Sequence, residues 1–243
     1  MLLLGSALVS VTMTTPIADC PHQIGASGVR VRLPPALSLN PSLSWAAPPT
    51  GWYFKPWNMI NASNAQYLAF RNLQYDPTTV DKTHPGGQVN DLTSFQAPGN
   101  DTIYTSYGVD IPDPRSGFTA VLQYAGTGVL TGATGEYSLM AWGCDALKQP
   151  YYASYSTETE FSNTPAGIDI MSTCDKGPDS ATVNALITAM KALPNPKIKA
   201  FATALTKMTQ DGGRNGYPRM VSAFGNSIVF LLADAVDPDA GYV

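Results

Sequence analysis

The stretch from Pro150 to Thr173, PYYASYSTETEFSNTPAGIDIMST, constrains the fold more than any other part of this chain. It opens with tyrosines and small residues and ends in the strict alternation of Ile168, Asp169 and Ile170, both of which are typical of β-strands. Residues Asn163 to Gly167, rich in turn-forming side chains, separate the two ends. The stretch therefore predicts two adjacent strands joined by a turn.

Directly after this pair the hydrophobic period changes from two residues to between three and four. One face of a helix is marked by Val183, Leu186, Ile187, Met190 and Leu193. We expect this helix to begin near Asp179 or Ser180, because Pro178 suits the approach to a first turn. A second short helix is expected within Lys197 to Met208. Strands closed off by a C-terminal amphipathic helix predict a small ligand-binding barrel.

Earlier segments carry the same strand signals at the spacing of an antiparallel sheet. The expected strands are Gly51 to Trp57, Tyr67 to Tyr75, Asp101 to Ile111, Phe118 to Ala125 and Gly135 to Trp142. The polar, turn-rich residues 76–91 are expected to form a long loop. With the pair at 150–173 this gives about eight strands, a mainly-β fold. A sheet that closes on itself loses its edges and leaves an interior able to hold one small ligand.

The chain divides into three parts by composition. Residues 1–44 are expected to be a leader that ends in an extended, mobile Pro-rich extension. Residues 45–219 hold the barrel and its closing helices. Residues 220–243 form an apolar tail that needs a partner surface, either the barrel exterior or a second subunit. A homodimer through this tail is one interpretation.

Composition excludes several classes of function. The net charge is −4, so no basic stripe is available to neutralise the phosphates of a nucleic acid. The two histidines, His22 and His84, are too few for a multi-histidine metal site, and no dinucleotide, phosphate-loop or nucleophile motif is found. We therefore expect no metal and no cofactor. No stretch is long and apolar enough for a transmembrane helix.

The three cysteines leave the cellular compartment open. In a secreted chain Cys144 and Cys174 could pair; otherwise both would be free thiols. The apolar N-terminus has the length of a signal peptide but lacks its basic region, and Asn61 and Asn100 begin glycosylation sequons. The odd cysteine count and the missing basic region favour the cytoplasm over secretion.

Three motifs resemble the lipocalin-like calycins of fungi. TGWYFKPW at Thr50 to Trp57 is similar to the first strand of that family, and SLMAWGC at Ser138 to Cys144 is similar to its sixth. TPAGIDI at Thr164 to Ile170, followed by the helix start GPDSATVNAL, resembles its last strand and closing helix. The resemblance spans roughly residues 45–219. It implies an eight-stranded antiparallel lipocalin-like β-barrel with C-terminal α-helices, which binds small, mostly apolar molecules.

Aromatic residues on the expected strands are the main candidates for contact with a ligand. Tyrosine and tryptophan combine apolar walls with a few oriented donors, which suits a polyketide or terpenoid guest. Many aromatic residues in strands only pack a core, so the assignment rests on which of them point inward. The candidates are Tyr53, Trp57, Tyr104, Tyr137, Trp142, Tyr152 and Tyr155.

Four residues are candidates for chemistry. A cationic Lys55 or Arg71 in the cavity could polarise a carbonyl, and a desolvated Glu160 could act as a general base. The hydroxyl of Tyr124 could stabilise an enolate or oxyanion. Asp169 is expected to face water, on the assumption that the flanking isoleucines face inward. A one-residue error in register would reverse each of these orientations.

Two hypotheses of function follow. In the first, the protein is a cofactor-free cyclase or isomerase of fungal secondary metabolism that folds an apolar intermediate inside the barrel; some fungal lipocalin-like proteins act in this way. In the second, it is a non-catalytic carrier of a small hydrophobic metabolite. The fold alone does not separate these uses. Charged and tyrosyl groups converging in the cavity would favour the enzyme.

Overall fold

The computed structural model describes residues 20, 25–38, 45–99, 101–115 and 118–214. The apolar tail 220–243, and with it the homodimer proposed through that tail, lies outside the described residues. In the described part of the chain, no helix is long and apolar enough to cross a membrane.

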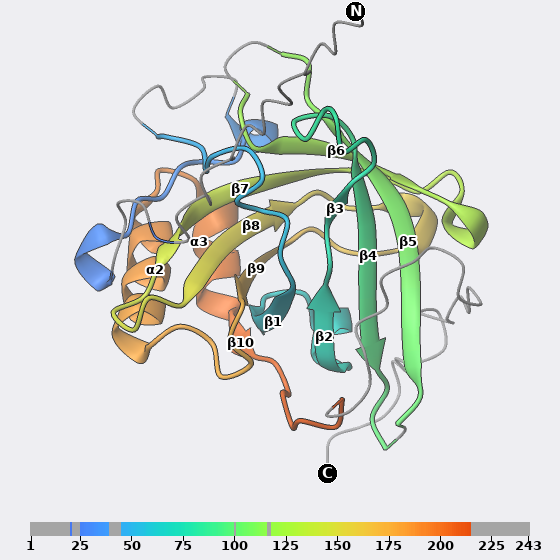
Figure 1. Ribbon diagram of the computed structural model, residues 1–243. Helices are drawn as coiled ribbons and strands as arrows, with labels where there is room; N and C mark the ends of the chain where they lie inside the picture. The colour runs from blue at the N-terminus through green and yellow to red at the C-terminus, as the bar shows by residue number, and fades with distance from the viewer. Residues whose placement is uncertain (1–19, 21–24, 39–44, 100, 116–117, 215–243) are drawn as a thin grey trace, which may run out of the picture.

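The secondary structure is dominated by strands (Figure 1). The described strands are β1 (Trp57–Ala62), β2 (Arg71–Tyr75), β3 (Thr78–Thr79), β4 (Val89–Gln96), β5 (Ile103–Pro112), β6 (Val121–Gly126), β7 (Thr134–Cys144), β8 (Pro150–Ser156), β9 (Gly167–Ser172) and β10 (Thr206–Lys207). The described α-helices are α1 (Ala65–Leu68), α2 (Ser180–Ala192) and α3 (Pro196–Ala204). Short 3-10 helices are η1 (Ala26–Gly28), η2 (Pro35–Leu37), η3 (Gly128–Leu130) and η4 (Glu160–Ser162).

Eight of these strands form a closed antiparallel barrel. Their order is β1-β2-β4-β5-β6-β7-β8-β9, and β9 pairs back onto β1, where Met59 lies opposite Met171 and Ala62 opposite Asp169. The short β3 and β10 pair with β4 and β1 outside this circuit. Neighbouring strands in the sheet follow one another along the chain, which is the up-and-down arrangement of lipocalin barrels. The predicted eight-stranded antiparallel lipocalin-like barrel is confirmed.

Helices α2 and α3 cover the outer face of β8 and β9 (Figure 1). Ile168 and Ile170 point outward into this layer, where they pack with Leu186, Met190 and Ile198. Because alternate residues of a strand point to opposite faces, Asp169 points into the barrel. The expectation that Asp169 faces water is wrong: the alternation is correct, but the helices make the outer face the apolar one.

The two helices begin where their capping residues are. Asp179 accepts a hydrogen bond from the backbone N–H of Thr182 at 2.9 Å, so α2 begins at Ser180, as predicted. Asn195 caps α3 in the same way through the N–H groups of Lys197 and Ile198. The expected second helix is thus confirmed and ends at Ala204, before β10.

The predicted β8–β9 pair and the strands at β5, β6 and β7 are confirmed with small shifts at their ends. Residues 51–56 form turns rather than a strand, and β1 begins only at Trp57. The segment Tyr67 to Tyr75 is divided between α1 and β2. The expected loop 76–91 contains β3 and the start of β4. The strand β4 was not predicted from the sequence.

Part of the predicted N-terminal extension packs onto the barrel. The Arg32 guanidinium is buried, donates to the carbonyl oxygens of Leu139 (2.8 Å), Thr119 (2.7 Å) and Ala120 (3.1 Å), and lies 3.9 Å from the ring centre of Trp45. The backbone N–H of Arg32 also bonds to Met140. Residues 25–38 therefore belong to the packed structure and differ from the expected mobile extension.

A disulfide fixes the same segment. It joins Cys20 to Cys144, the last residue of β7, across 124 residues of sequence, and leaves Cys174 as a free thiol. The suggested pairing of Cys144 with Cys174 is therefore wrong. A bond between the N-terminal segment and the barrel limits how far that segment can separate from it in the unfolded chain.

The buried guanidinium makes the N-terminal segment a testable part of the fold. We expect Arg32→Met to lower the free energy of unfolding by about 2–4 kcal/mol, because buried carbonyl groups lose their donors. The matched control is Arg30→Met, since Arg30 is exposed and its hydrogen bonds within the described residues go to the nearby carbonyls of Ser27 and Val29. This substitution should change stability by less than about 0.5 kcal/mol. Urea unfolding measures both. Equal effects would contradict the anchoring role.

Candidate functional site

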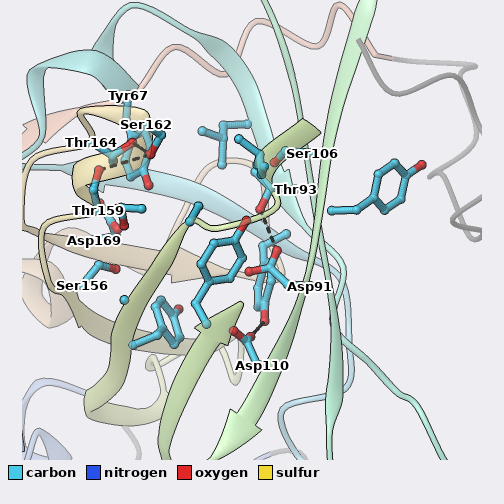
Figure 2. A pocket seen from close by; sticks show the side chains of 18 of the residues that line it. Tyr67, Asp91, Thr93, Ser106, Asp110, Ser156, Thr159, Ser162, Thr164 and Asp169 are labelled. Carbon is cyan, nitrogen blue, oxygen red and sulfur yellow. Dashed lines mark hydrogen bonds between the residues drawn. The ribbon is translucent and has the colours of Figure 1, made fainter. Parts of the chain in front are cut away.

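The barrel encloses a cavity of about 220 Å³ (Figure 2). Aromatic and aliphatic side chains line its walls together with hydroxyl and carboxyl groups. The lining residues on which the argument depends are Met59, Tyr67, Phe70, Leu73, Tyr75, Asp91, Thr93, Phe95, Tyr107, Asp110, Tyr124, Tyr137, Thr164, Asp169 and Met171. A cavity inside a small closed barrel is sized for one small ligand.

Aromatic residues fill the rest of the barrel interior. Trp52 lies 5.2 Å from Trp57 and 5.0 Å from Trp142 between ring centres, and Trp57 meets Tyr152 edge-on at 4.7 Å. The indole N–H of Trp57 donates to the carbonyl of Tyr53. The predicted contacts Tyr53, Trp57, Trp142 and Tyr152 thus belong to a packed aromatic cluster and do not line the cavity.

Two of the predicted aromatic residues line the cavity. Tyr137 does so from β7, with its hydroxyl bonded to that of Tyr152 at 3.0 Å. Tyr124 lines it from β6, and its ring lies over Gly108, where an added Cβ would come within 2.2 Å of the ring. A glycine on β5 is therefore what lets this ring sit against the sheet.

The remaining two predicted contacts lie elsewhere. Tyr155 points outward, because its position on β8 faces the helical layer, and it packs 6.2 Å from the ring of Phe201 on α3. Tyr104 contacts Phe95, with ring centres 5.9 Å apart, but does not line the cavity.

The predicted cations are also outside the cavity. Arg71 forms ion pairs with Asp101 at 2.6 Å and Asp211 at 2.7 Å. The Lys55 ammonium lies over the ring of Trp52, 4.8 Å from its centre. Glu160 belongs to η4, and its side chain is not among those described. Among the described lining residues there is no lysine, arginine or histidine.

Carboxyl groups replace the expected cations. Asp91 on β4 and Asp110 on β5 are diagonal neighbours on the inner face, since Asp91 lies opposite Gly108. The hydroxyl of Tyr75 donates to Asp110 Oδ2 at 2.9 Å, and the hydroxyl of Thr93 donates to Asp91 Oδ1 at 3.3 Å. Figure 2 shows Asp91, Thr93 and Asp110 together on one side of the cavity. We call Asp91 and Asp110 the β4–β5 acid pair.

Burial disfavours the charge on both members of this pair. It raises the pKa of Asp110 to about 6, and the hydrogen bond from Tyr75 offsets part of that rise. Burial, and next the nearby charge of Asp110, raise the pKa of Asp91 well above its ordinary value. The pair therefore titrates as a unit and holds a proton at pH values where exposed aspartates have none.

Asp169 stands apart from this pair. It lies between Ala62 of β1 and Ser154 of β8, is 3% exposed, and its Oδ1 has no hydrogen-bond partner in the described part of the chain. Burial alone raises its pKa to about 7. Figure 2 places it with Tyr67 and Thr164, away from Asp91 and Asp110. The cavity thus has acidic groups on two separate walls.

An aspartate that titrates near neutrality can both give and accept a proton under ordinary conditions. Sequence reasoning missed these three residues for different reasons. Asp91 was assigned to a loop and Asp169 was assumed to face water, whereas Asp110 was placed on an expected strand but given no role. The available signal was a lone Asp inside a strand pattern, as in Tyr107 to Ile111 and in Ile168 to Ile170. Such residues are rarely buried without a partner.

The amino-acid sequence is similar to that of a protein named for a biosynthesis cluster. It is 27% identical over 198 residues to "Botcinic acid biosynthesis cluster B protein 12" of Botryotinia fuckeliana (strain B05.10), covering 78% of this chain and 88% of that protein. No protein-family model matches.

Two solved structures are similar in fold. The siderocalin Ex-FABP superposes with a TM-score of 0.43 at 8% identity, over 64% of this chain and 92% of its own. H1 crustacyanin of the lobster Homarus americanus gives 0.44 at 14% identity, over 75% and 90%. The assignment of the fold rests on the strand order and closure of the barrel itself.

The unpartnered carboxyl makes stability depend on pH. The pKa of Asp169 is higher in the folded chain than the value of about 3.9 expected when unfolded, so the folded state holds its proton more tightly. The contribution of Asp169 to the free energy of unfolding should therefore fall as pH rises from about 4 to 7. We expect Asp169→Asn to match the wild type near pH 4 and to exceed it at pH 8 by about 1–4 kcal/mol.

Urea unfolding at both pH values measures this difference. The control is Asp175→Asn, because Asp175 is exposed and lies outside the cavity. A difference between Asp169→Asn and the wild type that is the same at pH 4 and pH 8 would contradict a buried, unpartnered carboxyl at this position.

Proposed function

We propose that the protein is a cofactor-free cyclase or isomerase that acts on an apolar polyketide- or terpenoid-type intermediate of fungal secondary metabolism, bound inside the barrel. The observation that carries this proposal is Asp169, a buried carboxyl with an unpartnered oxygen in the wall of a mainly apolar cavity. An isolated buried acid lowers stability, so its presence in a cavity points to chemistry.

The chemistry needs no external reagent. In a cyclisation or isomerisation a proton is taken from one atom of the substrate and returned to another, so the product has the composition of the substrate. A group with a pKa of about 7 can make both transfers near neutral pH. We assign this proton transfer to Asp169.

The cavity walls would supply shape and polarisation. The side chains of Phe70, Leu73 and Phe95 give apolar surface that can hold a flexible chain in one folded conformation. Hydroxyl groups of Tyr124 and Tyr137 can donate to an oxygen that gains negative charge. Burial raises the pKa of both phenols, so they remain protonated donors. The proposal gives no role to Arg71 or Lys55, whose contacts lie outside the cavity.

The similarity to a protein of the botcinic acid biosynthesis cluster supports the class of pathway. At 27% identity it does not transfer a substrate. It is consistent with a guest of the polyketide type, since the cavity is mainly apolar with a few placed hydroxyl groups.

The alternative is a non-catalytic carrier of a small hydrophobic metabolite. The Cys20–Cys144 disulfide favours it, because disulfides persist in oxidising compartments such as the secretory pathway. A carrier needs the cavity but does not need an acid that gives and takes a proton near neutral pH. The two functions therefore differ in what they require of Asp169.

Disruption of the gene in the producing fungus distinguishes the enzyme from the carrier. Loss of a cyclase or isomerase should accumulate a compound with the same mass as the product but a different chromatographic retention. Complementation with Asp169→Asn should restore less than about 1% of product, since acid–base catalysis contributes roughly a hundredfold or more. Asp175→Asn should restore it fully. Liquid chromatography with mass spectrometry reads both compounds.

Full restoration by Asp169→Asn would contradict the enzymatic proposal. A lower yield of unchanged products, with no compound of equal mass, would instead favour the carrier.

A further inference from the structure

The β4–β5 acid pair stands on a different wall from Asp169 and is not used by the proton transfer proposed above (Figure 2). Asp110 is 1% exposed, and its Oδ1 has no hydrogen-bond partner in the described residues although it lines the cavity. A buried carboxyl oxygen without a donor is an open acceptor site.

Aromatic rings stand around the same two carboxyl groups. Tyr75 touches Asp110 through its hydroxyl, and Tyr124 lies opposite Asp110 across the β5–β6 ladder. Both rings line the cavity beside the acids. The faces of aromatic rings attract cations, and this attraction grows when water is excluded. The carboxyl groups and the aromatic rings thus both favour a cation.

The described walls of the cavity supply no cation. Among the described lining residues there is no lysine, arginine or histidine to neutralise Asp91 and Asp110. An acid pair in which Asp110 is buried and Asp91 half-buried, with rings beside it, an open acceptor and no cation among the described lining residues, is complementary to a positively charged guest.

We propose that the β4–β5 acid pair, with Tyr75 and Tyr124, binds the protonated amine of a small ligand whose apolar part fills the rest of the cavity. This inference rests on the proposed function only in placing the ligand in this cavity. It narrows the substrate class to molecules with a basic nitrogen. A carboxylate guest is disfavoured, because it would meet buried acids on two walls.

Three probes of one skeleton test the inference: 4-phenylbutylamine, 4-phenylbutan-1-ol and 4-phenylbutyrate. They differ in charge at one end, and each is small enough for a cavity of about 220 Å³. Titration calorimetry of the full, disulfide-bonded chain at pH 7.5 should give an affinity for the amine at least tenfold above that for the alcohol. The carboxylate should bind more weakly than the alcohol.

Substitutions identify the residues that cause the preference for the amine over the alcohol. Asp110→Asn keeps the shape of the side chain and should bring the ratio of amine to alcohol affinity to within about threefold of one, while the affinity for the alcohol changes less than about threefold. Tyr124→Leu should lower the ratio by several-fold, since it removes a ring and keeps an apolar side chain. Asp175→Asn, on the surface, should leave the ratio unchanged.

Equal affinities for amine and alcohol in the wild type, no binding of any probe, or an amine preference that survives Asp110→Asn would each overturn the inference. None of these results bears on the proton transfer assigned to Asp169, which is read from the metabolites of the complemented strain. Conversely, an amine preference lost in Asp110→Asn would stand even if Asp169→Asn restored product fully.

Discussion

The pairing of β9 with β1 is the constraint from which the rest of the structure follows. Closure leaves the barrel without free edges and divides every strand into an inner and an outer set of residues. On β8 and β9 the outer set is apolar because α2 and α3 cover it. The inner set is thereby free to carry Ser154 and Asp169, so the helices on the outside determine that polar groups lie on the inside.

Two separate cores stabilise this arrangement. One lies between the barrel and the helices, and the other is the aromatic cluster around Trp52, Trp57 and Trp142 inside the barrel. The cavity occupies the part of the interior that the aromatic cluster leaves open. Unpartnered acids in its wall lower stability, and the two cores offset that cost. Functional sites commonly contain residues that lower the stability of the fold.

The sequence was sufficient for the elements with strong local patterns. The Ile168–Asp169–Ile170 alternation, Pro178 ahead of the helix start and the periodic face of α2 are local signals, and each led to the correct element. The strand β4 was missed because its inner positions carry Asp91 and Thr93, so no hydrophobic alternation marks it. At residues 51–56 aromatic composition suggested a strand where the chain turns.

The site could not be predicted with the same success, because it depends on tertiary structure. Alternation shows that Asp169 and its neighbours face opposite ways, but only the position of the helices decides which face is inside. The partner of Cys144 depends on where the segment containing Cys20 docks. The lining aromatic residues Tyr67 and Tyr75 come from segments whose strand or helix boundaries were misplaced.

Burial on the inner wall should bring the titration of Asp110 and Asp169 close to neutral pH. Carbon-13 NMR of the aspartate side-chain carboxyl groups, followed from pH 3 to 9, measures this directly. The structure predicts resonances with midpoints near 6 and 7, assigned to Asp110 and Asp169 by their loss in the corresponding asparagine variants. Titration of every aspartate below about pH 4.5, in the ordinary range of exposed carboxyl groups, would contradict it.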